Sequence, residues 1–278
     1  MQLWYWPYTL TPRRRLSDLA RPGAREGALL RAGDGFADVH PWPELGDAPL
    51  DEQLARLARG EATPLTRASL RLAQLDGEAR AHGVSLFEGL TIPESHWPGD
   101  DPPEAFDTAK LKGAKSIPPR GRLRIDFNGT LTPEEFLRVA ETLPRERIDF
   151  IEDPCAYDER TWRELRARTG LRLALDRQPG VADVLVHKPA LSDTFPAFEG
   201  EVVVTSYMDH PVGQFGAAYV AATHRVSARC GLFTHVLYQP DEFIDEIRAE
   251  GARLLPPRGT GIGFDELLER LPWKTLTP

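Results

Sequence analysis

The sequence predicts an α/β protein in which an N-terminal α+β unit, residues 1–83, precedes a (β/α) barrel, residues 84–251. Three observations support this fold class. Strand patterns precede helix patterns before Gly83, short strands alternate with helices after it, and three of the later strands end in an acid at nearly equal intervals. A chain of 278 residues is long enough to bury a barrel core together with a smaller unit.

The N-terminal unit combines strands with two helices. Three strands are predicted at residues 3–6, 27–31 and 34–39, and the glycines of residues 32–35 predict a hairpin turn between the last two. A loop with two prolines follows at residues 41–47. Apolar residues at helical spacing then predict helices over residues 50–60 and 64–82.

The second unit alternates strands and helices. Strands are predicted at residues 84–90, 109–112, 123–126, 150–152, 171–176, 184–187 and 202–206, with an eighth near 231–237. Helices are predicted at residues 133–142, 158–168 and 214–225, the first beginning at Thr132-Pro133 with acids behind it. This alternation indicates a parallel sheet, and the number of strands favours a closed barrel over an open sheet.

Two of the barrel crossovers are too short for a helix repeat. Only 14 positions separate Lys112 from Asp126, and 12 separate Asp176 from Lys188. Two consecutive prolines, Pro118 and Pro119, also exclude a helix from the first gap. We therefore expect two outer helices to be shortened or missing. The C-terminal residues, about 252–278, are expected to end in a short amphipathic helix and to return to the N-terminal unit.

Three acids carry the strongest chemical signal. Asp126, Glu152 and Asp176 each end a predicted strand, at intervals of 26 and 24 positions. Such an interval is close to one strand-plus-helix unit of about 30 residues, so the acids are expected at the same end of successive parallel strands. Convergent carboxylates repel one another unless they are protonated or neutralised, and a hard divalent cation neutralises them well.

Lysines flank these acids in the predicted barrel. Lys110 and Lys112 lie two residues apart on the strand before Asp126, so they share one face of it. Lys188 ends the strand after Asp176. A single lysine at a strand end is most often a solvated surface residue. Lysines and acids in this order along five strands indicate a catalytic site instead.

At these residues the chain resembles the enolase superfamily, in its muconate-lactonizing-like branch. Residues 35–47 and 64–70 are most similar to the o-succinylbenzoate synthase family of that branch. The resemblance implies a modified TIM (β/α) barrel with an N-terminal capping domain. It also implies a Mg²⁺-dependent enzyme, with Mn²⁺ able to substitute, that dehydrates 2-succinyl-6-hydroxy-2,4-cyclohexadiene-1-carboxylate in menaquinone biosynthesis.

The resemblance also implies a role for each site residue. Asp126, Glu152 and Asp176 resemble the metal ligands, and Lys112 resembles the catalytic base. Lys188 corresponds to the opposite cationic lysine, and Lys110 to a lysine that tunes Lys112. Residues expected near the substrate are Arg124, Asn128 and the segment from Ser206 to Gly213.

Two other readings stay open at this point. The same scaffold supports N-acylamino acid racemases and dipeptide epimerases, in which two opposed lysines act as two bases. A non-catalytic relic that keeps the barrel as a binding scaffold is favoured by the short crossovers and by Arg177, where the family usually carries an acid. Unpaired buried carboxylates are costly, which disfavours the relic.

Composition narrows the partners. The net charge of −8 disfavours nucleic acid, and no apolar stretch approaches the roughly 20 residues of a membrane span. Two cysteines, Cys155 and Cys230, make no disulfide framework, and the N-terminus lacks the pattern of a signal peptide. We expect a cytoplasmic protein with a small-molecule carboxylate as its partner.

Overall fold

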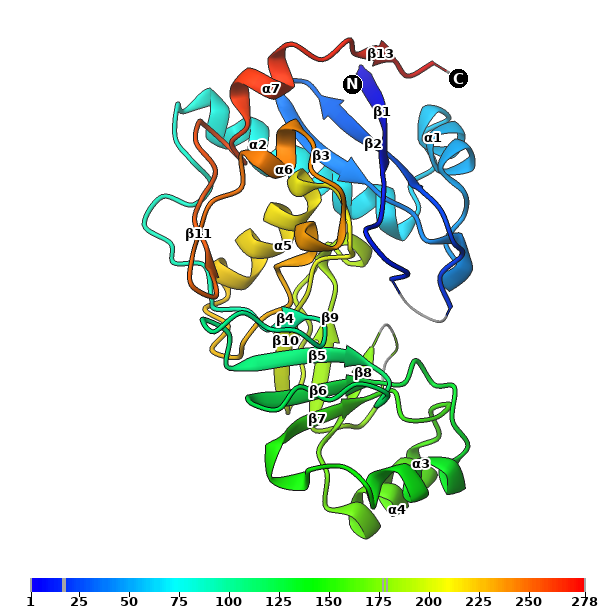
Figure 1. The fold of residues 1–278 in the computed structure, drawn as a ribbon. Helices are drawn as coiled ribbons and strands as arrows, with labels where there is room; N and C mark the ends of the chain where they lie inside the picture. Colours follow the sequence, from blue (N-terminus) through cyan, green and yellow to red (C-terminus); the bar gives the residue numbers. More distant parts are fainter. Residues whose placement is uncertain (1, 17–18, 177, 179, 278) are drawn as a thin grey trace.

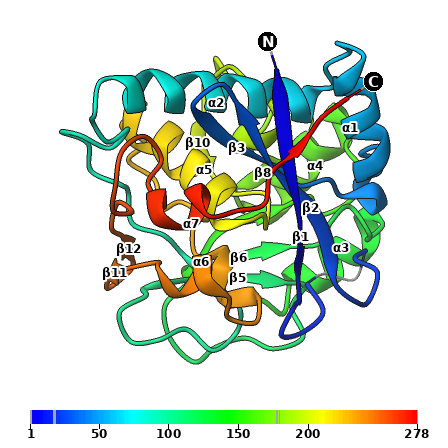
Figure 2. The ribbon, with the colours of Figure 1, turned by 90° about the horizontal axis from the view of Figure 1, so that it is seen from above.

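The structure is a computed structural model that describes residues 2–16, 19–176, 178 and 180–277. Figure 1 shows an N-terminal layer above a parallel sheet, and Figure 2 shows the same layer from above. The predicted fold class is confirmed. In the described residues the two main sheets are a four-stranded antiparallel sheet and a seven-stranded parallel one.

The antiparallel sheet has the order β13-β1-β2-β3. Its strands are β1 (Leu3–Leu10), β2 (Arg25–Ala32), β3 (Gly35–Val39) and β13 (Lys274–Thr275). Helices α1 (Leu50–Ala58) and α2 (Pro64–Ala81) follow β3, after the 3₁₀ turn η1 (Pro43–Leu45). A Cβ on Gly35 would lie 1.8 Å from the Ala73 carbonyl oxygen, so a glycine allows α2 to approach β3 closely.

The C-terminal segment returns to this sheet. It contains α6 (Glu242–Asp245), the short pair β11 (Ala249–Glu250) and β12 (Arg253–Leu254), and α7 (Asp265–Glu269). Strand β13 then pairs antiparallel with β1, Trp4 facing Thr275. The proposed unit boundary at residues 83 and 84 stays a prediction.

The parallel sheet runs in chain order from β4 to β10. Its strands are β4 (Trp97–Pro98), β5 (Thr108–Lys112), β6 (Arg122–Asp126), β7 (Ile148–Glu152), β8 (Leu173–Asp176), β9 (Val184–His187) and β10 (Glu201–Val204). Parallel bridges from Ser95 to Cys230 and from Thr205 to Gly231 join its two edges. The sheet is therefore curled like a barrel wall, with the eighth strand reduced to Cys230 and Gly231.

Two predicted strands are corrected. Residues 84–90 form no strand in the described chain; Ser85 makes only an isolated bridge to Gly261. The barrel instead begins at β4, whose two residues gave no strand pattern. Residues 234–237 of the expected eighth strand form the 3₁₀ turn η4 (Thr234–Leu237), because the wall is already closed by Cys230 and Gly231.

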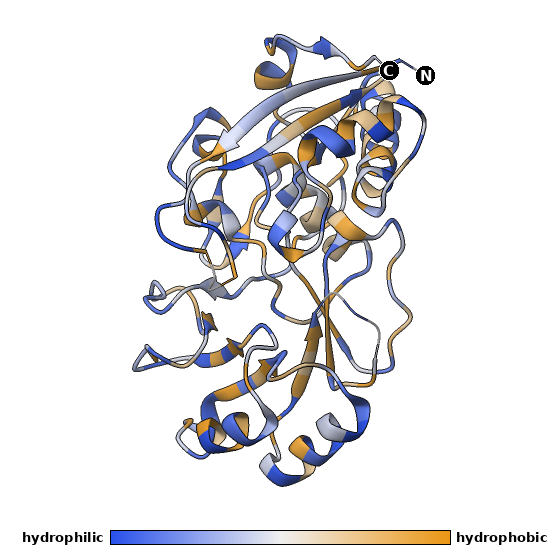
Figure 3. Ribbon diagram, turned by 90° about the vertical axis from the view of Figure 1, so that its right-hand side faces the viewer, coloured by the Kyte–Doolittle hydropathy of each residue, from blue (hydrophilic) through white to orange (hydrophobic). Residues whose placement is uncertain are grey.

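Helices cover the outer face of the barrel wall unevenly. Helices α3 (Pro133–Ala140) and α4 (Glu159–Thr169) pack on it, and Phe136 and Trp162 are buried against the strands. The two helices carry hydrophobic and hydrophilic residues side by side at the lower end of Figure 3. Among the described residues, no helix lies between β5 and β6 or between β8 and β9, as the short crossovers predict. Helix α5 (Pro211–Thr223) follows β10 and joins the core beneath the N-terminal layer.

Alternation along the strands separates an apolar interior from a charged mouth. Phe150, Ala174, Val184, Val186 and Val203 form a small buried cluster inside the curled wall. Two residues beyond such positions, at the carboxyl ends, the same face carries charged side chains. None of the helices in the described residues has the length and hydropathy of a membrane-spanning segment.

Candidate active site

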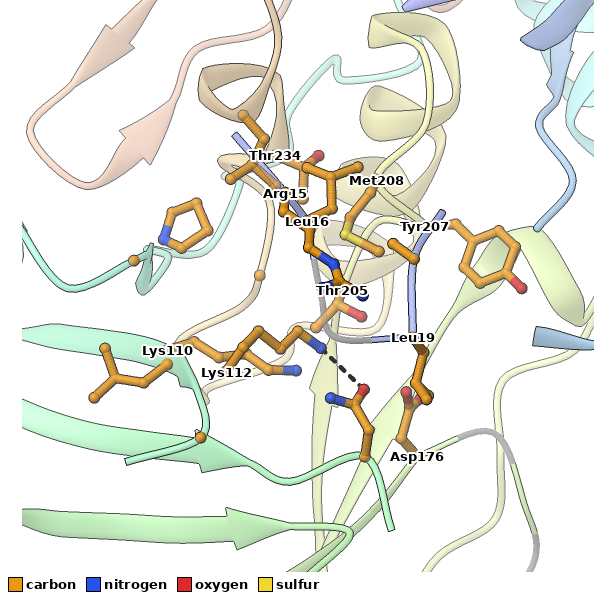
Figure 4. A pocket seen from close by; sticks show the side chains of 18 of the residues that line it. Arg15, Leu16, Leu19, Lys110, Lys112, Asp176, Thr205, Tyr207, Met208 and Thr234 are labelled. Atoms are coloured by element: carbon orange, nitrogen blue, oxygen red, sulfur yellow. Dashed lines mark hydrogen bonds between the residues drawn. The ribbon is translucent and has the colours of Figure 1, made fainter. Parts of the chain in front are cut away.

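A cavity of about 670 Å³ opens at the carboxyl ends of the parallel strands, beneath the N-terminal unit. Strand ends supply Lys110, Lys112 and Asp176 to its wall, and Lys188 follows β9. The N-terminal unit supplies Arg14, Arg15, Leu16, Trp42 and Glu44. Figure 4 shows Lys110 and Lys112 side by side, with Arg15 and Leu16 above them and Asp176 across the cavity.

The strand register explains why the predicted charges meet. Lys112 pairs with Asp126 across β5 and β6, and Asp126 pairs with Glu152 across β6 and β7. Asp176 lies two residues beyond Ala174, the register partner of Glu152. Because these strands are parallel, all of their carboxyl ends share one edge of the sheet.

Each predicted metal ligand forms an ion pair with a lysine. Lys112 Nζ donates to Asp126 Oδ2 at 2.5 Å, and Lys110 Nζ donates to both oxygens of Glu152 at 2.7 and 2.6 Å. Lys188 Nζ donates to Asp176. Asp126 and Glu152 are almost fully buried, at 2% and 1% exposure, so they lie behind the lysines as seen from the cavity.

The acids perturb one another's proton affinity. Burial, followed by the charge of Asp126, raises the pKa of Glu152 to about 7. Burial also opposes ionisation of Asp126, but Lys112 and Lys110 outweigh it and hold the pKa of Asp126 far below its ordinary value. Burial would lower the pKa of Lys110, yet Glu152, Asp126 and Asp176 together raise it. The site is thus a compact charge cluster in which the lysines compensate the acids.

A fourth acid in this cluster was missed from the sequence. Asp153 lines the cavity and accepts a hydrogen bond from the Asp176 backbone N–H at 3.3 Å. Burial, followed by the charges of Asp176 and Glu152, raises the pKa of Asp153 to about 8. Its position directly after Glu152 at a strand end was the available signal.

The donor set fits a hard divalent cation. As the side chains stand, no three His, Cys, Asp or Glu residues of the described chain gather tightly enough to hold an ion. The acids of the cluster nevertheless all offer carboxylate oxygens, and burial followed by the charges of neighbouring acids raises the pKa of Glu152 and of Asp153. Carboxylate oxygens are the ligands that Mg²⁺ prefers, and a dication would relieve this repulsion.

Two of the predicted substrate-binding residues line the cavity. Asn128 lines the cavity, its N–H donates to Asp126 Oδ1 at 2.8 Å, and its side-chain oxygen accepts from Lys112 at 3.4 Å. Ser206 also lines the cavity, and its hydroxyl lies 2.5 Å from that of Thr234. Arg177 lies outside the described residues.

Arg124 and Gly213 do not line the cavity, and their predicted part in substrate binding stays a prediction. Arg124 is 2% exposed and donates to Asp149 Oδ2 at 2.8 Å and to the Arg229 carbonyl at 2.6 Å, so it is part of the barrel interior. Gly213 lies in the first turn of α5, where a Cβ would meet the carboxyl groups of Asp38 and Asp209. Neither residue is among those that line the cavity.

Two further cavity residues were not predicted. His96, before β4, is buried; its Nδ1 lies 2.9 Å from Arg124 Nη1. Burial, followed by Arg124 and the two lysines of β5, lowers the pKa of His96, which keeps its ring neutral. Lys115 adds a cation at the exposed rim. Nothing in the sequence separated either residue from ordinary structural or surface positions.

Family models and related proteins match both units of the chain. Residues 3–79 match the family model described as O-succinylbenzoate synthase, N-terminal domain, and residues 97–180 match the model described as Enolase C-terminal domain-like. An o-succinylbenzoate synthase of Bdellovibrio bacteriovorus is 35% identical over 98% of each chain. A second, of Thermobifida fusca, is 27% identical over 88% of this chain and 85% of its own.

Solved structures agree on the fold. An L-Ala-D/L-Glu epimerase from Bacillus subtilis aligns with a TM-score of 0.74 at 14% identity, over 95% of this chain and 98% of its own. A muconate lactonizing enzyme from Pseudomonas fluorescens aligns with a TM-score of 0.72 at 15% identity, over 97% and 98%. A dipeptide epimerase from Enterococcus faecalis, solved with Mg and a dipeptide, aligns with a TM-score of 0.74 at 14% identity, over 94% and 98%. Because these structures are only 14–15% identical to the chain, they support the fold alone.

Proposed function

Because the chain belongs to the o-succinylbenzoate synthase family of the enolase superfamily, a family of carbon–oxygen lyases, we propose that it converts 2-succinyl-6-hydroxy-2,4-cyclohexadiene-1-carboxylate to o-succinylbenzoate. The reaction is a syn-dehydration, and we place it in menaquinone biosynthesis in the cytoplasm. Two free, buried cysteines are compatible with a reducing compartment. The observation that carries the proposal is the ring of lysines and acids at the carboxyl ends of five consecutive strands.

We assign the metal to the three predicted acids. Asp126, Glu152 and Asp176 would hold Mg²⁺, for which Mn²⁺ can substitute, and Asn128 supports Asp126 through its backbone N–H. When bound, the ion supplies positive charge that stabilises the enolate of the substrate carboxylate, as in superfamily sites that combine a Lys or His base with Mg²⁺.

Lys112 is the proposed base and acid. Its neutral amine takes the proton α to the substrate carboxylate, and the C–H electron pair enters the enolate. The resulting ammonium then gives the proton to the departing hydroxide as the C–O bond breaks, so that water and an aromatic ring form. Lys112 is paired with Asp126 in the structure, so opening of this ion pair must precede the base role.

Lys188 and Lys110 have supporting roles. Lys188 directly follows β9 and lines the cavity. We expect it to face the substrate from the side opposite β5, where its positive charge would stabilise negative charge on the intermediate. Lys110 is held protonated by Glu152, since its pKa is raised, and it therefore supplies a fixed positive charge beside Lys112. Arg14, Arg15 and Lys115 make the cavity rim cationic, which suits a substrate with two carboxylates.

The test is turnover with and without metal. We expect the purified protein to form o-succinylbenzoate, to lose this activity after treatment with EDTA, and to regain it with Mg²⁺. Full activity in EDTA would contradict the metal assignment. Exchange of the α-proton of both enantiomers of an N-acylamino acid in D₂O, without dehydration, would instead assign the chain to the racemase chemistry that its fold also supports.

A further inference from the structure

Two buried acids meet between the N-terminal unit and the barrel, away from the charge cluster of the active site. Asp38 lies on β3, and Asp209 lies in the loop between β10 and α5; they are 8% and 2% exposed. A Cβ on Gly213 would lie 2.6 Å from Oδ2 of each. The two Oδ2 atoms therefore lie within about 5 Å of each other, and the glycine provides the space that they occupy.

The pair lacks a cationic partner. Asp38 accepts from the Tyr8 hydroxyl at 2.6 Å and from the His210 N–H at 3.1 Å. Oδ1 of Asp209 is buried and has no hydrogen-bond partner among the described residues, while the Ser206 hydroxyl and the backbone N–H groups of Tyr207 and Asp209 favour the ionised form of this carboxyl group. No lysine or arginine of the described chain forms an ion pair with either acid. Two neighbouring buried carboxylates without a compensating cation cannot both remain ionised at low cost.

The loop that carries Asp209 forms part of the cavity wall. Ser206, Tyr207 and Met208 all line the cavity. Their backbone is held from the opposite side, because Trp42 Nε1 donates to the Tyr207 carbonyl at 2.8 Å and the Tyr238 hydroxyl donates to that of Met208 at 2.5 Å. Asp38 accepts from the His210 N–H, so Trp42 and Asp38 both connect this loop to the N-terminal unit.

We propose that Asp38 and Asp209 share one proton, and that the resulting acid–carboxylate pair positions the loop of residues 205–210 against the N-terminal unit. The two are positioning residues, since neither lines the cavity. They act through the backbone of Tyr207 and Met208. The positioning role rests on the proposed function, because it requires that this loop contacts the substrate. The shared proton is independent of any reaction.

The surroundings agree with a shared proton. Burial raises the pKa of Asp209 to about 7, and burial followed by the charge of Asp209 raises the pKa of Asp38. The ionisable groups around the pair are Tyr8 of β1, His40 after β3, His210 of the loop and Tyr238 after η4. Arg25 of β2 lies behind them, where it pairs with Glu44 and acts on His40 and Tyr238. Burial lowers the pKa of His40 and of His210 to about 3, so neither imidazole supplies a positive charge at neutral pH.

The first experiment measures proton linkage and needs no substrate. A carboxyl group whose folded pKa lies above its unfolded value keeps its proton in the native state while the unfolded chain releases it, so its contribution to stability falls as pH rises from about 4 to about 7 and is constant above. Asp209→Asn removes this titration. We expect the wild-type protein to release about one more proton on unfolding near pH 5.5 than Asp209→Asn does, measured from urea unfolding midpoints across pH.

Asp38→Asn is the second variant and Asp51→Asn, an exposed acid of α1, is the control. Asp38→Asn should show the same loss of pH dependence, and the control should match the wild type. An asparagine is close in shape to a protonated acid, so both interface variants should be at least as stable as the wild type at pH 7.5. A loss of stability that is independent of pH, or failure of both variants to fold, overturns the shared proton.

The second experiment tests positioning. In the wild type, affinity for o-succinylbenzoate measured by calorimetry should weaken as pH rises above 7, because both acids ionise and repel, whereas in Asp209→Asn this component should be missing. Equal pH dependence in both proteins overturns the positioning role. If neither protein binds o-succinylbenzoate at any pH while the proton linkage differs as expected, the proposed function fails and the shared proton stands.

Discussion

The exposed fractions of three lysines distinguish their roles at the residue scale. The side chain of Lys112 is 33% exposed, against 14% for Lys110 and 11% for Lys188. All three lysines pair with acids, and Lys112, the most exposed of them, is the one that a substrate atom reaches most directly. This ordering supports Lys112 as the group that moves a proton and the others as fixed charges.

Replacement of Lys112 should therefore remove the chemistry and leave the cavity. We expect Lys112→Ala to lower kcat by at least about 100-fold, within the range that general acid–base catalysis supplies. Steady-state kinetics and calorimetric binding of o-succinylbenzoate measure the two effects separately. Lys274→Ala, on β13, is the control. Wild-type turnover by Lys112→Ala would exclude it as the base.

Arg124 illustrates a structural role at a position where a substrate contact was predicted. Its guanidinium lies 4.7 Å from the centre of the Phe150 ring and donates to Asp149 at 2.8 Å inside the barrel. Arg122, on the same strand, donates to the same Asp149 at 2.8 Å, but its side chain is 63% exposed. Replacement of each arginine in turn therefore compares the loss of a buried ion pair with the loss of an exposed one.

We expect Arg124→Ala to lower the free energy of unfolding by about 3–5 kcal/mol, because it leaves Asp149 with a buried charge that has lost its interior partner. Arg122→Ala should cost about 1 kcal/mol or less, since exposed pairs are screened by water. Urea unfolding measures both. An Arg124→Ala protein of wild-type stability with a raised KM would restore the substrate-contact reading and contradict the structural one.

At the scale of elements, helix signals in the sequence were reliable where a cap was present. The Thr132 hydroxyl accepts from the Glu135 N–H at 3.2 Å, and Glu135 accepts from the Thr132 N–H at 2.8 Å, so a capping box forms at the helix start expected at Thr132-Pro133. We expect Thr132→Ala to cost about 1 kcal/mol in unfolding free energy, and Thr132→Ser, which keeps the hydroxyl, to cost much less. Equal losses in the two variants would mean that the methyl group, and not the cap, stabilises α3.

Glycines in α5 provide a second comparison. A Cβ on Gly213 would lie 2.6 Å from both Asp209 and Asp38, whereas a Cβ on Gly216 would meet the flexible end of Leu72 at 2.6 Å. Gly213→Ala should therefore destabilise the protein by about 1–3 kcal/mol through overpacking. Gly216→Ala should be close to neutral, because alanine favours the helix by about 1 kcal/mol over glycine. Thermal unfolding distinguishes them, and equal shifts would contradict the tight packing around Gly213.

The barrel ends were the least predictable elements, for a physical reason. Residues 84–90 have an apolar strand pattern, but their hydrogen bonds go to Gly261, which donates to the Val84 carbonyl at 2.8 Å and accepts from Leu86 at 2.7 Å. That partner comes from the C-terminal return, so no local pattern indicates it. The two-residue strand β4 and the bridge at Cys230 and Gly231 are too short to produce a periodic signal.

At the scale of the whole molecule, the site residues that the sequence predicts are those that recur at the regular strand–helix interval. The strand–helix interval places Asp126, Glu152 and Asp176 at one edge of the sheet without knowledge of any contact. Asp153 was missed because it adjoins a strand end without continuing the interval. The Asp38–Asp209 pair was missed because its two members come from different units, and only the docking of those units brings them together.

Metal binding should appear as a property of the whole fold. The proposed ligand acids converge only when the strands are paired, so Mg²⁺ should bind the native state and not the unfolded chain. It should then raise the free energy of unfolding by about 2.7 kcal/mol at 100 times its Kd. The ion pairs between the lysines and these acids must open before Mg²⁺ binds. The increase in unfolding free energy therefore measures whether the dication displaces the lysines from the acids. We expect urea unfolding in Mg²⁺ and in EDTA to differ for the wild type and for Asp51→Asn, and to coincide for Asp126→Asn. A Mg²⁺ effect that persists in Asp126→Asn would place the ion elsewhere on the protein, and the lysines would then be the permanent partners of these acids.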